Sequence, residues 1–246
     1  MKWRNQAVRT LLVDLDGTLL ESRQFPLRME FVVRSLIRFK KHGGWTRSFR
    51  FLKKLRAEFE SPLEAERSFT NAERAARAFG REMGMLQEVA SVTLHSEVTA
   101  VFPYLKRHFY PVQGAREFLE WARPRYRLIL ATNPVWPLEQ VKLRLEWAGI
   151  DPSIFTSITH SGRMHACKPT AEYYRELLEQ EGLEASECAL IGDDVRKDLP
   201  ATQVGISVFI LTKKKSLRGL SLPNATAQAV SGNYAFLTRL LEEVHP

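Results

Sequence analysis

The sequence predicts an α/β protein, with a parallel sheet covered by helices on both faces and a helical segment inserted near its start. Short apolar runs alternate with amphipathic stretches beyond residue 112, the pattern of strand–helix–strand units. An isolated strand-like run at 11–13 precedes them. Residues 25–107 lie between these parts, are rich in helix formers and suggest no strand before 90–98.

Individual elements follow from hydrophobic period and turn residues. Strands are predicted at 127–132, 155–159, 188–192 and 207–211, because each is a short apolar run. Helices are predicted at 115–122, 138–149, 171–182, 195–203 and 232–244, and several of them end in Gly. Strands that alternate with helices favour a parallel sheet.

Size and composition limit the class of protein. The 246 residues are 44% hydrophobic, enough for one large domain or for a core with a smaller second domain. Two cysteines are too few for a disulfide framework. No apolar run approaches the ~20 residues that span a bilayer, and the first ten residues lack the apolar stretch of a secretory signal. We therefore expect a cytoplasmic protein.

The net charge of +8 is concentrated in residues 21–56, which hold eleven Lys or Arg and only two Glu, or +9, so the rest of the chain is about neutral. Within residues 28–56, apolar and basic side chains alternate at roughly helical spacing, and the sequence HGGW at 42–45 interrupts them. Two amphipathic helices are predicted. Their apolar stripes are formed by Phe31, Ile37, Phe39, Phe49, Leu52 and Leu55.

This basic segment has three interpretations. Its apolar stripes could form the core of the inserted segment, with the cations as a solvated face. Alternatively, some cations attract an anionic substrate, in which case reversing the charges of Arg47, Arg50 and Lys53 raises KM. The third interpretation is contact between residues 28–56 and a membrane surface or a nucleic acid.

Polar groups follow the predicted strands. They are Asp14 and Asp16, then Thr132 and Asn133, then Lys168, and finally Asp193 and Asp194. Ligands of open parallel sheets bind at the carboxyl ends of the strands, so one site built from four segments is expected. Clustered carboxylates repel one another, which calls for a cation, and oxygen ligands suit Mg²⁺.

Each of these groups also has an ordinary explanation when taken alone. The Asp-Gly pair at 16–17 is a common turn, and residues 132–134 suit the end of a strand and the start of a helix. Lys168 alone resembles a surface lysine. His165 and Cys167 invite a Cys/His nucleophile, but no third partner is evident, so Cys167 is interpreted as a packing residue.

The sequences DLDGT, ATN, CKP and GDDVRKD, in this order between residues 14 and 198, resemble the four motifs of the haloacid-dehalogenase-like (HAD) hydrolase superfamily. The insertion after the first motif resembles the helical caps of its phosphoglycolate-phosphatase-like branch. The resemblance implies a Rossmann-like core at residues 1–22 and 108–246. It also implies an α-helical cap domain at residues 23–107.

The resemblance implies a role for each acidic motif residue. Asp14 would be the nucleophile that forms an aspartyl-phosphate, and Asp16 would protonate the leaving oxygen and later activate water. The carboxylates of Asp14 and Asp193, with the main-chain carbonyl of Asp16, would ligate Mg²⁺. Asp194 would be a second ligand or act through water. Asp198 would be an outer partner of Lys168 or of metal-bound water.

The remaining motif residues would surround the phosphate. Gly17 and Thr18 would form a tight turn close to it. The Thr132 hydroxyl and the Asn133 backbone amide would donate to a phosphoryl oxygen.

By the same resemblance, Lys168 would supply positive charge to Asp14 and to the transition state. The next residue, Pro169, is expected to open the following helix and so to orient the lysine.

The residue at position 16 indicates the reaction class. Relatives that cleave carbon–halogen bonds need no acid there, and relatives that cleave carbon–phosphorus bonds replace it. Asp16 therefore implies a phosphatase, with a phosphomutase as the alternative, and a helical roof favours small substrates. The rival class is a non-catalytic protein that holds nucleic acid or an anionic membrane through the basic segment.

Overall fold

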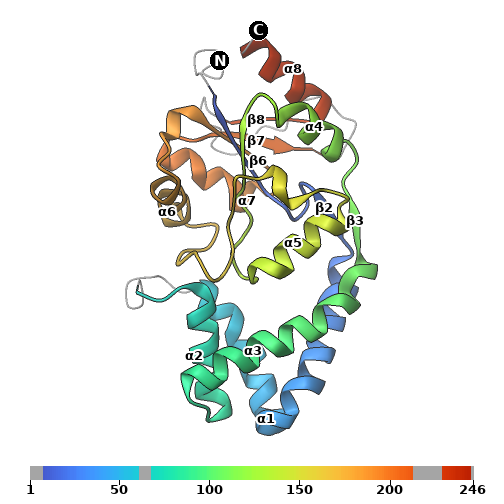
Figure 1. Cartoon of the computed structure of the whole chain (residues 1–246), viewed down its shortest axis with the longest axis vertical. Coiled ribbons are helices and arrows are strands. Elements are labelled where there is room, and N and C mark those ends of the chain that lie inside the picture. The colour runs from blue at the N-terminus through green and yellow to red at the C-terminus, as the bar shows by residue number, and fades with distance from the viewer. Residues whose placement is uncertain (1–7, 61–67, 213–228, 245–246) are drawn as a thin grey trace.

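The computed structural model describes residues 8–60, 68–212 and 229–244. Figure 1 shows a sheet flanked by helices and, beyond one end of it, a separate helical lobe made of α1, α2 and α3. The predicted α/β class with an inserted helical segment is confirmed. Within the described parts of the chain, none of the helices combines the length and apolar character that a bilayer crossing requires.

A parallel sheet with strand order β5–β4–β1–β6–β7–β8 forms the centre of the larger part. Its strands are β1 (Thr10–Val13), β4 (Arg127–Leu130), β5 (Ser157–Ile158), β6 (Cys188–Gly192), β7 (Ser207–Leu211) and β8 (Ala229–Gly232). The helices of this part are α4 (Ala115–Ala122), α5 (Leu138–Trp147), α6 (Ala171–Glu181), α7 (Val195–Asp198) and α8 (Tyr234–Val244). The β6, β7 and α4 bounds are those predicted.

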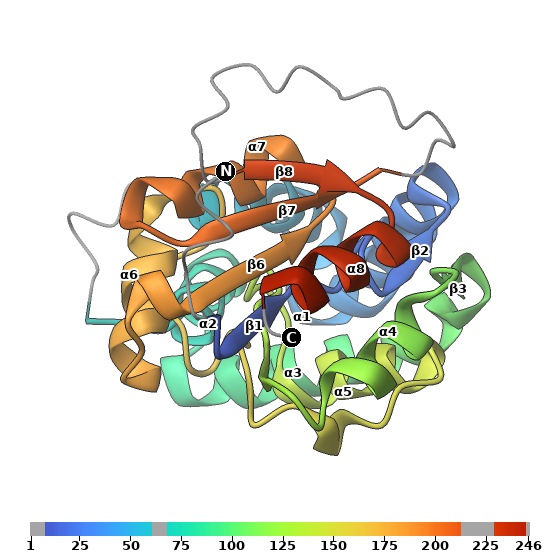
Figure 2. The ribbon, with the colours of Figure 1, turned by 90° about the horizontal axis from the view of Figure 1, so that it is seen from above.

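Alternating residues of the strands face opposite sides of the sheet and build two apolar layers. Leu11 and Val13 pack with α4, α5 and α8, whereas Leu12 packs with α6. Figure 2 shows α4 and α8 on one side of the sheet and α6 on the other. Because both faces of β1 are covered, all four of its residues are buried.

The predicted helix at 195–203 is wrong in its second half. The α-helix α7 ends at Asp198, and a 3-10 segment continues over Leu199–Val204. Pro200 cannot donate the backbone hydrogen bond that an α-helix would need at that point.

The chain leaves the sheet for the helical lobe and returns through a short antiparallel ribbon. Strand β2 (Leu20–Ser22) pairs with β3 (Phe109–Pro111), with Glu21 opposite Tyr110. Neither strand was predicted, because three residues carry too little pattern to distinguish a strand from a loop.

The helical lobe consists of α1 (Gln24–Glu60), α2 (Asn71–Met83) and α3 (Gln87–Val101), followed by a 3-10 segment over Phe102–His108. The predicted interruption of the basic segment is confirmed, since Gly44 has φ 76° and ψ 176° and divides α1 into two helical halves. The possible strand at 90–98 is wrong. Those residues lie in α3, because packing against α1 and α2 outweighs the strand preference of their Val and Thr residues.

The apolar stripes of α1 form only part of the lobe's core. Phe39, Phe51 and Phe79 are buried and meet in pairs at 5.0 to 5.6 Å between ring centroids. By contrast, Ile37 is 51% and Phe49 is 60% exposed. The interpretation that the apolar stripes form the core of the inserted segment is therefore wrong for these two residues.

Several cations of α1 pair with carboxylates of the lobe. Glu97 on α3 accepts hydrogen bonds from Arg38 and His42, and its carboxylate also pairs with Lys41 at 2.6 Å. Glu82 on α2 lies 2.8 Å from Arg50 and 2.6 Å from Lys54, and the hydrogen bond from Lys54 lowers the pKa of its carboxyl. These pairs join α1 to its two neighbours.

Candidate active site

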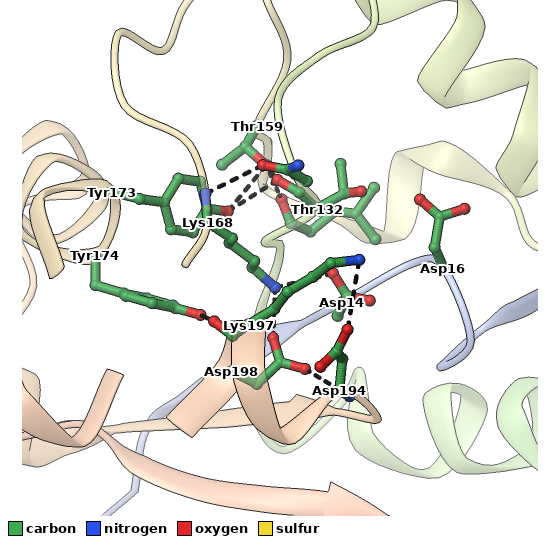
Figure 3. Close-up of polar contacts among 12 residues, drawn as sticks. Asp14, Asp16, Thr132, Thr159, Lys168, Tyr173, Tyr174, Asp194, Lys197 and Asp198 are labelled. Carbon is green, nitrogen blue, oxygen red and sulfur yellow. Dashed lines mark hydrogen bonds and ion pairs between the residues drawn. The ribbon is translucent and has the colours of Figure 1, made fainter. Parts of the chain in front are cut away.

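The strand order fixes where a ligand site can form. From β1 the chain continues to β4 and β5 on one side of the sheet and then returns to β6 on the other side. Parallel sheets bind ligands at the carboxyl edge where the strand order reverses, which here is the end of β1. Figure 3 shows side chains from the loops after β1, β4, β5 and β6 gathered at this edge.

A buried lysine joins two carboxylates at the centre of the site. Lys168 Nζ donates to Asp14 Oδ1 at 2.9 Å and to Asp198 Oδ1 at 2.8 Å. Figure 3 shows its amine between the two acids. Asp14 is held in place by β1, because its backbone N–H donates to Ile191 O at 2.9 Å and so extends the ladder to β6.

Burial and charge act against each other in this cluster. Burial raises the pKa of Asp14 to about 7, and the attraction of Lys168 opposes that rise. Burial alone would lower the pKa of Lys168, but Asp14 and Asp198 outweigh it and raise this pKa well above its usual value. Lys168 is therefore a permanent cation beside Asp14.

The loop after β1 passes close to Asp193. Gly17 has φ +85°, and a Cβ atom on it would lie 2.1 Å from Asp193 Oδ2, so only glycine fits. The hydroxyl of Tyr234, at the start of α8, donates a hydrogen bond to Thr18 O at 2.9 Å and holds the loop in place. The Thr18 hydroxyl is buried and has no hydrogen-bond partner among the described residues.

A second buried hydroxyl without a described partner belongs to Thr132. The main chain around it is firmly held, since Thr132 O accepts from Thr159 Oγ1 at 2.7 Å and from the Tyr173 hydroxyl at 3.0 Å. Asn133 Oδ1 accepts from the backbone N–H of Lys168 at 3.1 Å. A buried hydroxyl without a partner is costly, so the two threonines suit a ligand with acceptor oxygens.

Asp16 points away from Asp14 in Figure 3 and contacts a residue that the sequence did not single out. Arg144 Nη1 on α5 donates to both carboxylate oxygens of Asp16, at 2.8 and 3.0 Å. The Arg144 side chain is only 4% exposed, and its Nε and Nη2 atoms have no partner among the described residues. Its position beside Val141 and Ala148, on the buried face of the helix, is a signal that could have identified it.

Two of the three acids after β6, Asp194 and Asp198, have different surroundings. Asp198 is buried against Lys168, and a Cβ on Gly192 would lie 2.1 Å from Asp198 Oδ2. Asp194 is the N-cap of α7 and accepts from the backbone N–H of Arg196 at 2.9 Å. The Asp194 carboxylate therefore has a structural partner in the helix start.

Two expectations near Lys168 are settled by local geometry. Pro169 does not open the next helix, because α6 begins at Ala171 with Thr170 as its N-cap. Burial raises the pKa of the Cys167 thiol to about 12. His165 is engaged elsewhere, with Nδ1 2.7 Å from a Glu176 oxygen, so the two residues do not form an activated nucleophile.

The donor set at this edge suits Mg²⁺. Over the described ranges, no three His, Cys, Asp or Glu side chains form a ready metal-binding group. The family resemblance implies a smaller set, namely the carboxylates of Asp14 and Asp193 and the main-chain carbonyl of Asp16. Burial raises the pKa of Tyr234, and the nearby carboxylates of Asp14 and Asp193 raise it further, so both acids lie on the side of this tyrosine. The loop that carries Asp16 lies against Asp193 at Gly17. These oxygens, completed by water, fit the octahedral preference of Mg²⁺.

The parallel sheet carries an Asp–Lys–Asp cluster at its carboxyl edge, the edge at which enzymes with a Rossmann-like core bind their ligands. Residues 8–204 match the model of the family described as haloacid dehalogenase-like hydrolase. The chain belongs to this family of enzymes, and the predicted membership is confirmed. No curated protein matches the sequence.

Solved structures share the fold over nearly the whole chain. A 2-haloacid dehalogenase from Pseudomonas syringae has 16% identity and a TM-score of 0.61, and the match covers 96% of this chain and 98% of that one. The HAD-hydrolase YfnB from Bacillus subtilis, bound to magnesium, has 16% identity and a TM-score of 0.56, and the match covers 96% of this chain and 99% of that one. A predicted phosphoglycolate phosphatase from Haemophilus somnus has 16% identity and a TM-score of 0.56, and the match covers 96% of this chain and 98% of that one. At such identities the likeness concerns the fold alone.

Proposed function

We propose that this enzyme is a Mg²⁺-dependent phosphomonoester hydrolase, acting on a small phosphate ester through an aspartyl-phosphate on Asp14. The observation that carries the proposal is the buried bridge from Lys168 to Asp14 and Asp198, next to the two buried threonine hydroxyls. A cation that holds a carboxylate nucleophile, surrounded by donors for phosphoryl oxygens, is the arrangement that phosphoryl transfer requires.

In the first step an Asp14 carboxylate oxygen attacks phosphorus, and the bond to the leaving oxygen breaks. The Thr132 hydroxyl and the backbone N–H of Asn133 donate to the phosphoryl oxygens, and Lys168 offsets the negative charge of these oxygens. Asp16 gives its proton to the leaving oxygen. To do so it must turn from Arg144 toward Asp14.

In the second step water attacks the phosphorus of the aspartyl-phosphate, and Asp16 accepts a proton from that water. The products are inorganic phosphate and free Asp14. Asp14, Asp193 and the Asp16 carbonyl would hold Mg²⁺, with Asp194 acting through water, and the bound ion would let the anionic ester approach an anionic carboxylate. The magnesium-bound Bacillus subtilis relative supports this choice of metal.

The helices α1–α3 serve as a cap in this proposal. They stand between the carboxyl edge of the sheet and solvent, which favours a small substrate. The residue at position 16 favours a phosphate ester over a carbon–halogen bond.

Turnover should depend on added Mg²⁺. We expect phosphate release from 4-nitrophenyl phosphate, and from members of a panel of phosphorylated metabolites near neutral pH, to fall to background with EDTA. It should return with excess Mg²⁺, because carboxylates and waters hold this ion loosely. Mn²⁺ or Co²⁺ should restore part of the phosphate release.

Three outcomes would contradict this proposal. Full turnover after exhaustive chelation removes the metal from the mechanism. Transfer of phosphate to a second hydroxyl of the same substrate, without release, indicates a phosphomutase. No turnover, together with salt-sensitive binding to nucleic acid or to anionic vesicles, indicates a non-catalytic protein.

Neutralising the basic face of α1 should leave KM nearly unchanged. Arg47, Arg50 and Lys53 are exposed, and Arg50 already pairs with Glu82. We expect the Arg47→Gln, Arg50→Gln, Lys53→Gln variant to keep KM within about twofold at low salt, because exposed charges act weakly over distance. A large rise in KM at unchanged kcat would instead favour attraction of an anionic substrate.

A further inference from the structure

A largely apolar pocket of about 350 Å³ lies between the helical lobe and the sheet domain. All three lobe helices contribute to its wall, and the loop after β4 closes it on the other side. Its aromatic wall consists of Phe31, Phe39, Phe51 and Trp136. Ser91 and His95 of α3 also line it and are exposed.

The pocket and the candidate active site share the loop after β4, and within it the lining residue Val135 donates its N–H to Asn133 O at 2.9 Å. Its lining residues 135–137 are separated by one residue from Asn133, which with Thr132 faces the phosphate in the proposed mechanism. Ser161, another lining residue, donates its N–H to Trp136 O at 2.8 Å and accepts from Ala72 N–H of α2 at 2.8 Å. A ligand held by the loop after β4 can therefore extend into this pocket.

The side chains that line the pocket disfavour a charged ligand group. Among the described residues that line the pocket, none is Asp, Glu, Lys or Arg. Trp136 is fixed by edge-on contacts with Phe31 at 5.3 Å and Phe102 at 5.1 Å between ring centroids. The Ser161 hydroxyl is buried and has no partner in the described parts of the chain, so it can contact a ligand, and Ser91 and His95 are the other polar side chains of the lining.

We infer that this pocket binds the leaving group, and that the substrate is a monophosphate ester of an uncharged, largely apolar alcohol or phenol. The inference rests on the proposed phosphatase function. A cavity of ~150 Å³ accommodates one benzene ring, so 350 Å³ suits about two rings or an equivalent alkyl group. A carboxylate would lose hydration there without gaining a Lys or Arg partner, and a sugar has more hydroxyls than the three polar side chains of the lining can bind.

Two primary-alkyl esters with similar leaving oxygens test this substrate class. For the full-length protein with Mg²⁺, kcat/KM for 3-phenylpropyl phosphate should exceed that for glycerol 1-phosphate by about tenfold or more, since apolar contacts discriminate on this scale. Equal values, or a preference for glycerol 1-phosphate, would overturn the inference.

A matched pair of variants on α3 locates the effect. Ser91→Trp places an indole into the pocket from an exposed position, whereas Ser96→Trp adds the same group at an exposed position outside the lining residues. We expect Ser91→Trp to lower kcat/KM for 3-phenylpropyl phosphate about tenfold, mainly through KM. Ser96→Trp should leave kcat/KM unchanged for both esters, and Ser91→Trp should leave kcat/KM unchanged for glycerol 1-phosphate. Equal effects of the two variants, or an equal loss for both esters, would contradict the pocket assignment.

Binding without turnover separates this inference from the proposed function. Titration calorimetry should detect 3-phenylpropan-1-ol binding to the parent and to Ser96→Trp, with at least about tenfold weaker binding to Ser91→Trp. If the alcohol binds in this way but no ester is hydrolysed, the pocket assignment holds and the phosphatase proposal fails. If esters are hydrolysed but the alcohol does not bind, the leaving-group inference fails alone.

Discussion

Asp14→Asn should abolish turnover, lowering kcat by about 10⁴-fold or more, as loss of a covalent nucleophile does in other enzymes. The amide has nearly the same volume as the carboxylate but cannot attack phosphorus. The fold should persist, because Lys168 keeps its ion pair with Asp198 at 2.8 Å. Asp16→Asn should be nearly as severe, because the leaving oxygen and the attacking water lose their proton partner.

Single-turnover kinetics and urea unfolding check this expectation together. Asp151→Asn is the matched control, since Asp151 is exposed and caps a short 3-10 segment at Pro152–Ile154. It should keep the parent's kcat, because Asn caps nearly as well as Asp. Turnover of Asp14→Asn near that of the parent would exclude an aspartyl-phosphate on this residue.

The sheet was predictable where a local pattern sufficed. Strands β6 and β7 are five-residue apolar runs, and every residue in them is buried, so their bounds match the prediction. The ribbon of β2 and β3 and the edge strand β8 were not predicted. Such short segments become strands through partners distant in the sequence, and their own residues carry little signal.

The assembly of the motif residues at one edge was predictable for a similar reason. Parallel strands all present their carboxyl ends to the same side, so Asp14, Thr132 and Asp198 converge once the strand order is known. The supporting contacts were not predictable. Arg144 reaches Asp16 across 128 residues and Tyr234 reaches Thr18 across 216, and no motif spacing encodes either contact.

The inserted segment shows where pattern alone misleads. One interpretation of the helical spacing placed Ile37, Phe39 and Phe49 in the lobe's core. The packing of α1 against α2 and α3 buries Phe39 as expected, but it buries Phe51 and leaves Ile37 and Phe49 exposed. Residues two apart on a helix point about 200° away from each other, so Ile37 and Phe39 cannot both face the core, and neither can Phe49 and Phe51.

Removing the buried cation should affect both catalysis and stability. We expect Lys168→Met to lower kcat by about 10² to 10³-fold, the usual loss when one charge-stabilising group is removed. The Lys168 side chain is 1% exposed, so Asp14 and Asp198 would be left buried and close together without their partner. Breaking a buried pair in this way costs about 3 to 5 kcal/mol in the free energy of unfolding.

Urea unfolding in metal-free buffer measures the stability effect, and a second substitution tests its cause. Asp198→Asn added to Lys168→Met should recover part of the lost stability, because one of the two uncompensated charges is removed, but it should not recover turnover. Lys197→Met is the control: Lys197 is half exposed and lies 3.6 Å from Asp194, so its loss should change stability by less than about 0.5 kcal/mol. A Lys168→Met variant as stable as the parent, or a double variant without any recovery, would show that the Lys168 charge does not hold the two carboxylates in the fold.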